Sequence, residues 1–272
     1  MNFVQQPMQQ ELSDSPDRST GLKTLAIEVI GREGSIALMD DARVVEARWL
    51  GRESRAAAGL AVQISDLAEK RLPDRLLSSL DGISVAVGPG SFTGLRVAVT
   101  TAKTLGYALQ IPIVAVNSLC AIAELSPVEN AKRAVAASAV LVGLSAYRGQ
   151  VYRGRFVAGE DADIDLVSAE QWKTELQSAV SCGTAQPMAC DETPHSHDEK
   201  KYIFMGDRAV FDRVGVEISD AQWAGDGLQR AAGVGRLGVE MLRRGETTPA
   251  MDLVPDYLRP SAAEEKASGA IG

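Results

Sequence analysis

A run that is apolar except for one serine, ISVAVG at residues 83–88, leads directly into a glycine-rich loop and then into a segment with almost no charge. A short apolar run of this kind predicts a strand in the centre of a sheet, covered on both faces. Residues 93–109 have the length of a helix, and Lys103 is the one charged residue after Arg96. A buried strand that feeds a helix is the repeating unit of α/β proteins, so the chain is constrained to a layered α/β fold.

Strands and helices alternate around this unit. Residues 22–30, 35–39 and 44–50 are predicted strands joined by tight turns, which is typical of an antiparallel meander. A helix over 54–72 precedes the strand at 83–88, and a strand over 111–116 and a helix over 118–125 follow the helix at 93–109. The order βββαβαβα predicts an α/β sandwich with mixed sheets.

The second half repeats this order weakly. Residues 137–145 and 150–157 are predicted strands around a turn, like the opening pair, which indicates two lobes of related topology. Further along we expect a helix over 169–180, a strand over 201–205 and a glycine-containing helix over 228–244. The predicted organisation is a disordered leader (1–21), an N-terminal lobe (22–130), a C-terminal lobe (131–262) with a polar insertion (183–200), and a frayed tail (263–272).

Composition excludes several classes of function. The 272 residues are 45% hydrophobic and 24% charged, which is typical of a globular protein. A net charge of −8 argues against direct nucleic-acid binding, since phosphate contacts need a concentrated positive surface. Three cysteines are not a disulfide framework, and no apolar run approaches 18 residues. We therefore expect a cytoplasmic protein with no membrane contact.

The glycine-rich loop is the first candidate site. Glycines let backbone amides approach a ligand closely, and a helix N-terminus attracts anions. The candidate residues for an anion site are Gly88, Pro89, Gly90, Ser91, Thr93, Gly94 and Arg96. The spacing does not match the phosphate loop of nucleotide-binding enzymes, which ends in Gly-Lys-Ser/Thr. The alternative is a tight strand-to-helix turn that needs glycine for its backbone conformation.

The helices at 54–72 and 93–109 are the second candidate site. The second helix is apolar nearly all the way round, and a sheet can cover only one of its faces. Either the second lobe covers the rest, or a partner protein or second copy does. The residues predicted to contact a partner are Leu60, Ile64, Leu67, Ala98, Ala102, Leu105 and Leu109.

No catalytic residue and no metal site is predicted. The two histidines, His195 and His197, lie in the polar insertion, and their spacing from Cys182 and Cys190 matches no standard zinc pattern. Asp207 follows a strand and Gly206, where it is either a carboxylate that faces a ligand or the N-cap of a helix.

The motifs GPGSFTGLR at 88–96 and IPIVAVNSL at 111–119 resemble the TsaB (YeaZ) family of the bacterial threonylcarbamoyladenosine tRNA modification system. Weaker likenesses follow at 150–152, at 206–207 and in PDYLRP at 255–260. The resemblance covers most of residues 22–262. It implies a two-lobed actin-like ATPase (ribonuclease H-like) fold, in which each lobe is built on the βββαβαβα order.

The resemblance also implies a function. TsaB-like proteins act as non-catalytic scaffolds that pair with the related catalytic subunit TsaD through the two first-lobe helices. With the ATPase TsaE they support threonylcarbamoyl transfer to N6 of adenosine 37 in tRNAs that read ANN codons. This implies TsaD-like and TsaE-like partners, a homodimer when the chain is alone, and only indirect contact with tRNA. No cofactor is required by this chain, and ATP and metal are expected on the partner subunits.

Two departures from the family pattern bear on the cleft between the lobes. Glu28-Val29-Ile30 stands where the family has Asp-Thr-Ser, a turn that meets phosphate and metal in actin-like folds, and Ser145-Ala146-Tyr147 replaces Asp-Ala-Arg. Valine and isoleucine side chains donate no hydrogen bonds, which disfavours nucleotide binding. The alternative functions are a kinase or glycoprotease-like (M22) hydrolase of the same fold, or a homodimer with a diverged role.

Overall fold

The computed structural model describes residues 21–31, 33–51, 56–72, 77–126, 138–182, 201–220, 222–225 and 230–259. The first half contains β1 (Lys23–Glu28), β2 (Gly34–Asp40), β3 (Arg43–Leu50), α1 (Ala56–Arg71), the short 3-10 helix η3 (Leu77–Ser79), β4 (Gly82–Gly88), α2 (Phe92–Leu109), β5 (Ile113–Asn117) and α3 (Ser118–Ala123). The second half contains β6 (Ser138–Ser145), β7 (Gln150–Val157), β8 (Asp163–Ser168), α4 (Ala169–Cys182), β9 (Lys201–Gly206), α5 (Arg208–Val214), β10 (Trp223–Gly225) and α6 (Arg230–Arg243).

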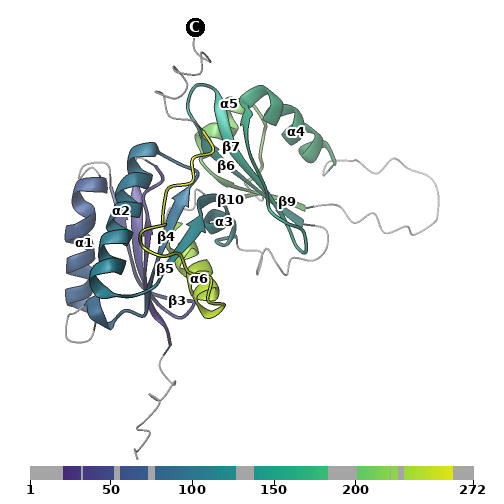
Figure 1. The fold of residues 1–272 in the computed structure, drawn as a ribbon. Coiled ribbons are helices and arrows are strands. Elements are labelled where there is room, and N and C mark those ends of the chain that lie inside the picture. Colours follow the sequence, from purple (N-terminus) through teal and green to yellow (C-terminus); the bar gives the residue numbers. More distant parts are fainter. Residues whose placement is uncertain are drawn as a thin grey trace, which may run out of the picture.

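The first lobe is built on a five-stranded mixed sheet in the order β3-β2-β1-β4-β5. β1 pairs antiparallel with β2 and parallel with β4. Alternate residues of β1 enter different cores: Leu25 and Ile27 pack with α1 and α2, whereas Ala26 packs with α3 and α6 on the other face. Figure 1 shows helices on both faces of this sheet. The strand β4 is buried along its whole length, as its apolar sequence predicted.

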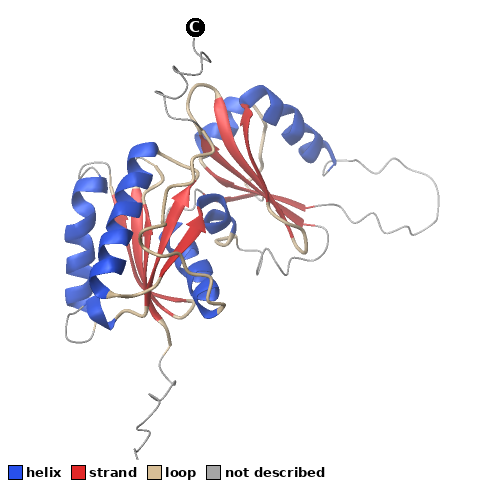
Figure 2. Cartoon of the chain, in the orientation of Figure 1, coloured by secondary structure: helices blue, strands red, loops and turns tan. Residues whose placement is uncertain are grey.

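The second lobe repeats the topology with the order β10-β9-β6-β7-β8. Here β6 takes the place of β1, and it pairs antiparallel with β7 and parallel with β9. Helices α4 and α5 cover the outer face of this sheet (Figure 2), around a core that includes Trp172, Phe204 and Phe211. Sequence reasoning missed β8, α5 and β10. β8 and β10 are short and only partly buried, so they carry weak hydrophobic periodicity.

Helix α6 corrects the predicted lobe assignment. The sequence predicts the helix over 228–244 as part of the C-terminal lobe (131–262), but α6 packs on β1, β2 and β4 of the first sheet. Its glycines make this close approach possible. A Cβ at Gly233 would lie 1.9 Å from the Ala121 carbonyl oxygen, and one at Gly238 would lie 2.3 Å from the Ser84 Cβ. The glycines that weaken the helix in isolation therefore fit it closely against α3 and the sheet.

The two lobes share a hydrophobic core. One cluster joins Leu119 and Ile122 of α3 to Val140 and Val142 of β6. The second sheet therefore packs one face on α4 and α5 and the other on the first lobe. Within the described residues, no helix is long and apolar enough to cross a membrane. The predictions for residues 1–20, 183–200 and 263–272, and for the lobe boundary at 130, fall outside the described residues.

Candidate functional site

The structure turns most of the predicted partner-contact residues towards the protein interior. Five of the seven pack against the first sheet in the chain's own core: Leu60, Ile64, Leu67, Ala98 and Ala102. The other two, Leu105 and Leu109, are partly exposed. Assigning those five to a partner was wrong, because the apolar stripe at i, i+3 and i+4 is the stripe that an amphipathic helix turns towards its own sheet.

The outward faces of α1 and α2 carry a different set of residues. Val62 on α1 and Tyr107 on α2 are each 67% exposed, and each has an exposed alanine beside it in sequence. Threonines occupy much of the remaining outward face of α2: Thr93, Thr100 and Thr104. Helix α2 is therefore less uniformly apolar than its sequence suggested. The outward face still combines two large apolar side chains with small ones, which allow another helix to approach closely.

The chain after α6 extends this surface. Residues 246–259, which we call the strap, pass along α2 (Figure 1, yellow). Lys103 Nζ donates to the Met251 carbonyl oxygen at 3.2 Å, and Arg96 Nε donates to the Tyr257 hydroxyl at 3.1 Å. The Tyr257 ring stacks on Phe92 with 4.8 Å between centroids. The strap therefore contacts the N-terminal end of α2 and the middle of its C-terminal half.

Backbone pairing also holds the strap to the sheet. The Thr248 amide donates to the Ile113 carbonyl oxygen at 2.8 Å, and the Asp256 amide donates to the Val87 carbonyl oxygen at 2.7 Å. Leu253 is buried in the first-lobe core. The strap nevertheless leaves two large apolar side chains largely exposed, Met251 at 76% and Val254 at 66%. The sequence indicated an ordered segment at 254–260, but not its contact with α2.

The glycine loop is packed against backbone. The Ser91 amide donates to the Ile30 carbonyl oxygen at 2.7 Å, and the Ser91 hydroxyl accepts from the Gly94 amide at 3.5 Å as the N-cap of α2. A Cβ at Gly94 would lie 2.0 Å from the Val29 carbonyl oxygen, and one at Gly88 would lie 2.1 Å from that of Asp256. These contacts support the tight-turn alternative over the anion site.

The other candidate residues of the loop lie in separate surroundings. Pro89 is buried, and its peptide bond to Gly88 is cis. Thr93 and Arg96 are exposed on α2, and the Arg96 guanidinium lies 3.7 Å from the centroid of the Phe92 ring. Gly90 and Ser91 instead line a cleft between the lobes. The structure therefore does not gather the predicted anion-site residues around one point.

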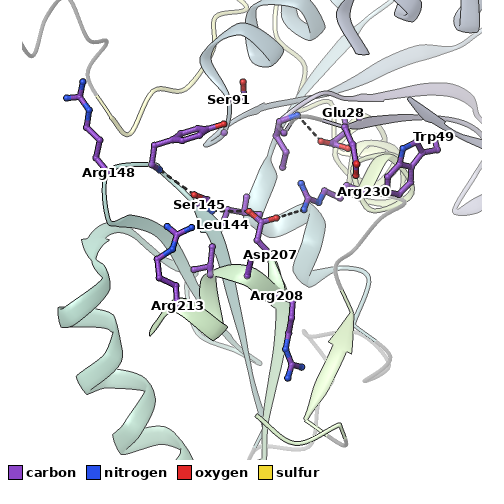
Figure 3. A pocket seen from close by; sticks show the side chains of 18 residues that line it. Glu28, Trp49, Ser91, Leu144, Ser145, Arg148, Asp207, Arg208, Arg213 and Arg230 are labelled. Atoms are coloured by element: carbon purple, nitrogen blue, oxygen red, sulfur yellow. Dashed lines mark hydrogen bonds and ion pairs between the residues drawn. The ribbon is translucent and has the colours of Figure 1, made fainter. Parts of the chain in front are cut away.

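The cleft between the lobes has a volume of about 670 Å³ (Figure 3). The first lobe contributes Glu28, Trp49 and Ser91, and the second lobe contributes Ser145 and Asp207. Four arginines also line it: Arg148, Arg208, Arg213 and Arg230. Arg208 turns away from the centre of the cleft in Figure 3, towards the Trp223 ring. The Arg230 side chain lies between Glu28 and Asp207, so an arginine and two carboxylates line this part of the cleft.

Glu28 points into the protein. Its Oε1 accepts from the Ile30 amide at 2.8 Å, and its Oε2 accepts from the Ser35 hydroxyl at 3.0 Å. The Ser35 oxygen in turn accepts from the Ala231 amide at 3.0 Å, which ties the start of α6 to this group. Burial raises the pKa of the Glu28 carboxyl above its ordinary value, and the opposing influences of Arg230 and the two hydrogen bonds are smaller.

Asp207 is engaged by both lobes. It occupies the N-cap position of α5, but its side chain makes no capping hydrogen bond. Its Oδ2 accepts from the Ser145 amide at 3.0 Å within the second lobe. Its Oδ1 accepts from Arg230 Nη2, also at 3.0 Å, and Arg230 belongs to the helix that packs on the first lobe. Asp207 is therefore the N-cap residue of α5 by position, as one sequence interpretation had it, while its carboxylate lines the cleft between the lobes.

These residues do not fit the phosphates and metal of a nucleotide. Each Glu28 carboxylate oxygen already accepts a hydrogen bond from the protein, and the Val29 and Ile30 side chains are buried where the family pattern has hydroxyls. Asp207 is already paired with an arginine. No group of three or more histidine, cysteine or acidic residues in the described part of the chain could hold a metal ion. His195, His197 and Cys190 lie outside the described residues, and so does the side chain of Cys182.

The buried Glu28 predicts a pH dependence of stability. A carboxyl whose pKa is raised by folding binds a proton more tightly in the folded state, so the free energy of unfolding falls as pH rises through the window above about 4.5. The fall is about 1.4 kcal/mol per pH unit within that window. In Glu28→Gln this component disappears, which urea unfolding at several pH values will measure.

Glu46 supplies a control of opposite sign. Hydrogen bonds from Arg71 and Arg48 hold its pKa below the ordinary value. Its contribution to stability is present above that value and is lost as pH falls. Glu46→Gln should therefore flatten the acid side of the stability profile only. A Glu28→Gln profile parallel to that of the unsubstituted protein would contradict the account of Glu28.

Comparison with known proteins agrees with this architecture. The sequence model of the TsaD family, tRNA N6-adenosine threonylcarbamoyltransferase, matches residues 55–214. The tRNA threonylcarbamoyladenosine biosynthesis protein TsaB of Bacillus subtilis is 30% identical over 206 residues, which cover 71% of this chain and 76% of that protein. A transferase of Geotalea uraniireducens is 28% identical over 109 residues, which cover 35% of this chain and 32% of the transferase.

Solved structures identify the fold. YeaZ from Pseudomonas aeruginosa superposes with a TM-score of 0.61 at 20% identity, covering 87% of this chain and 99% of that one. The duplicated strand order and this likeness define a two-lobed protein of the actin-like ATPase fold, as the resemblance implied. Within that class, the identity and coverage of the Bacillus subtilis protein place the chain in the TsaB family.

Proposed function

We propose that this chain is a non-catalytic subunit of the tRNA threonylcarbamoyladenosine system and binds a TsaD-like protein through the outward faces of α1 and α2. The observation that carries the proposal is the pair of large, exposed apolar side chains, Val62 and Tyr107, on adjacent helices of a TsaB-family fold. Aromatic side chains surrounded by small neighbours are favoured contact points in protein interfaces.

The match to the TsaD model supports the choice of partner. Residues 55–214, which include α1 and α2, resemble the partner itself. Two chains of the same fold can pair through equivalent surfaces, much as identical subunits pair about a two-fold axis. The same face would then support a homodimer when the chain is alone, and the heterodimer would replace it when TsaD is present.

The remaining components are those that the family resemblance implies. A TsaE-like ATPase and the TsaD-like subunit supply ATP and metal in the cytoplasm, and the complex transfers threonylcarbamoyl to N6 of adenosine 37 in tRNAs that read ANN codons. This subunit contacts tRNA only indirectly, since a net charge of −8 gives it little attraction for phosphate. Its contribution is to hold the catalytic subunit in an active complex.

Co-purification with the TsaD protein of the same organism tests the proposal. The tagged chain should retain untagged TsaD through size-exclusion chromatography and elute as a heterodimer. Sedimentation of the chain alone should show a dimer that disappears when TsaD is added. A chain that sediments as the same dimer with and without TsaD would instead favour a homodimer with a diverged role.

A kinase or glycoprotease-like hydrolase of the same fold is the second candidate, and it makes an opposite prediction. Such an enzyme needs ATP and metal in the cleft, where Glu28 and Asp207 are already paired with protein groups. Calorimetric titration with Mg²⁺-ATP should therefore show no heat of binding at micromolar concentrations. Measurable micromolar binding would favour the enzyme and oppose the proposed function.

A further inference from the structure

Arg230 links the two lobes through its own side chain. The residue after it is fixed to the first lobe through the hydrogen bond between the Ala231 amide and Ser35. Its guanidinium is bonded to Asp207 of the second lobe, which is also held by the Ser145 amide at the end of β6. The Arg230 side chain is 12% exposed and that of Asp207 is 35% exposed. The pair therefore joins the lobes at the wall of the cleft, with Arg230 largely buried and Asp207 about one-third exposed.

The other contacts between the lobes connect this ion pair with the angle between them. The lobes already contact each other through the apolar cluster around α3, which packs on β6, β7 and β9. The ion pair lies across the cleft. The ion pair adjoins the apolar cluster, since Ala231, Leu144 and Met205 belong to that cluster. Apolar contacts tolerate small shear movements of one lobe over the other, whereas a bonded ion pair adds one directional contact between them. The strap adds a further link, because Arg259 Nη1 donates to the Ala146 carbonyl oxygen at 2.5 Å.

We propose that Arg230 and Asp207 form an internal latch that holds the two lobes at one angle without a bound ligand. Arg230 supplies the positive charge between the lobes, flanked by Glu28 on one side and Asp207 on the other (Figure 3). The latch would keep the cleft in a single state although no nucleotide bridges the lobes. It concerns the lobe angle and not partner binding, so it stands apart from the proposed function.

A distance measurement between the lobes tests the latch. Two spin labels, attached to the thiols introduced by Ser65→Cys on α1 and Glu170→Cys on α4 with the native cysteines replaced by serine, report the lobe separation by pulsed electron resonance. Both positions are exposed, so the labels should leave the fold intact. We expect one narrow distance distribution, and a clearly broader one in Arg230→Gln and in Asp207→Asn. Arg243→Gln is the matched control. Arg243 lies on the same helix as Arg230, but its ion pair with Asp41 lies within the first lobe.

A double-mutant cycle supplies a second readout. Removing one partner leaves the other charge poorly solvated, so each single variant should lower the folding equilibrium constant about tenfold. The double variant should lose no more than the larger single variant, because the two residues act as a pair. Arg230→Lys, which keeps the charge, provides a folded comparison with a narrow distribution.

Two results would overturn the latch. One is a distance distribution in Arg230→Gln as narrow as that of the unsubstituted chain, which would mean that the α3 cluster alone sets the angle. The other is a double variant whose loss equals the product of the two single losses, which would mean that the side chains do not interact.

Discussion

Replacing Val62 and Tyr107 together by aspartate strongly weakens binding to TsaD without unfolding the chain. Both side chains are 67% exposed, so the free energy of unfolding should change by no more than about 0.5 kcal/mol. In the proposed complex, the same two positions would bury unpaired carboxylates against apolar partner surface. That penalty, added to the lost contacts, should weaken binding by roughly 100-fold or more, measured by calorimetric titration with TsaD.

The control for this experiment changes the charge equally elsewhere. Lys173→Asp on α4 also shifts the net charge by two negative units, at an exposed position of the second lobe. It should leave TsaD binding unchanged. Equal weakening by both variants would point to long-range electrostatics, and undiminished binding of the α1–α2 variant would exclude this face as the docking site.

Substituting alanine for Gly94 destabilises the chain severely. The added methyl would lie 2.0 Å from the Val29 carbonyl oxygen, a backbone atom that cannot move without disturbing the end of β1. We expect a loss of about 2–4 kcal/mol in the free energy of unfolding, measured by urea denaturation. This loss of stability should appear even in phosphate-free buffer, because Gly94 is required for packing and not for binding an anion.

Gly51→Ala is the matched control for this substitution. Among the described residues, its methyl would meet the Trp49 side chain alone, at 3.6 Å, which is an ordinary contact. Stability should therefore change by no more than about 0.5 kcal/mol. A Gly94→Ala variant that unfolds at the same urea concentration as the unsubstituted protein would refute the packing role and reopen the anion site.

The sequence predicted those elements whose periodicity is strong. The buried strand β4 and the helix α2 follow from ISVAVG and the apolar segment after it, and their ends agree with the structure within one residue. The position of α6 could not be predicted in this way. Its pattern identifies a helix, but only the close packing of Gly233 and Gly238 on α3 and β4 assigns it to the first lobe.

The residues of the candidate site were harder to predict, because what matters there is whether a helix side chain faces the core or the outside, and composition does not determine this. Leu60 and Ile64 gave the clearest stripe in the first helix, and that stripe belongs to the core. The exposed Val62 lies between these two residues in the sequence, and the pattern of apolar residues does not mark it as exposed. Arg230 and Asp207 are 23 residues apart, and nothing in the sequence pairs them; their contact depends on α6 crossing back to the first lobe.

Reconstitution of the modification tests the central claim most directly. Purified TsaD and TsaE, the threonylcarbamoyl adenylate, ATP and a tRNA that reads an ANN codon are incubated with and without this chain, and threonylcarbamoyladenosine is measured by mass spectrometry of the digested tRNA. We predict product only when the chain is present, and loss of that product with the Val62 and Tyr107 double variant. Equal product formation with the chain omitted would contradict its role as a required subunit.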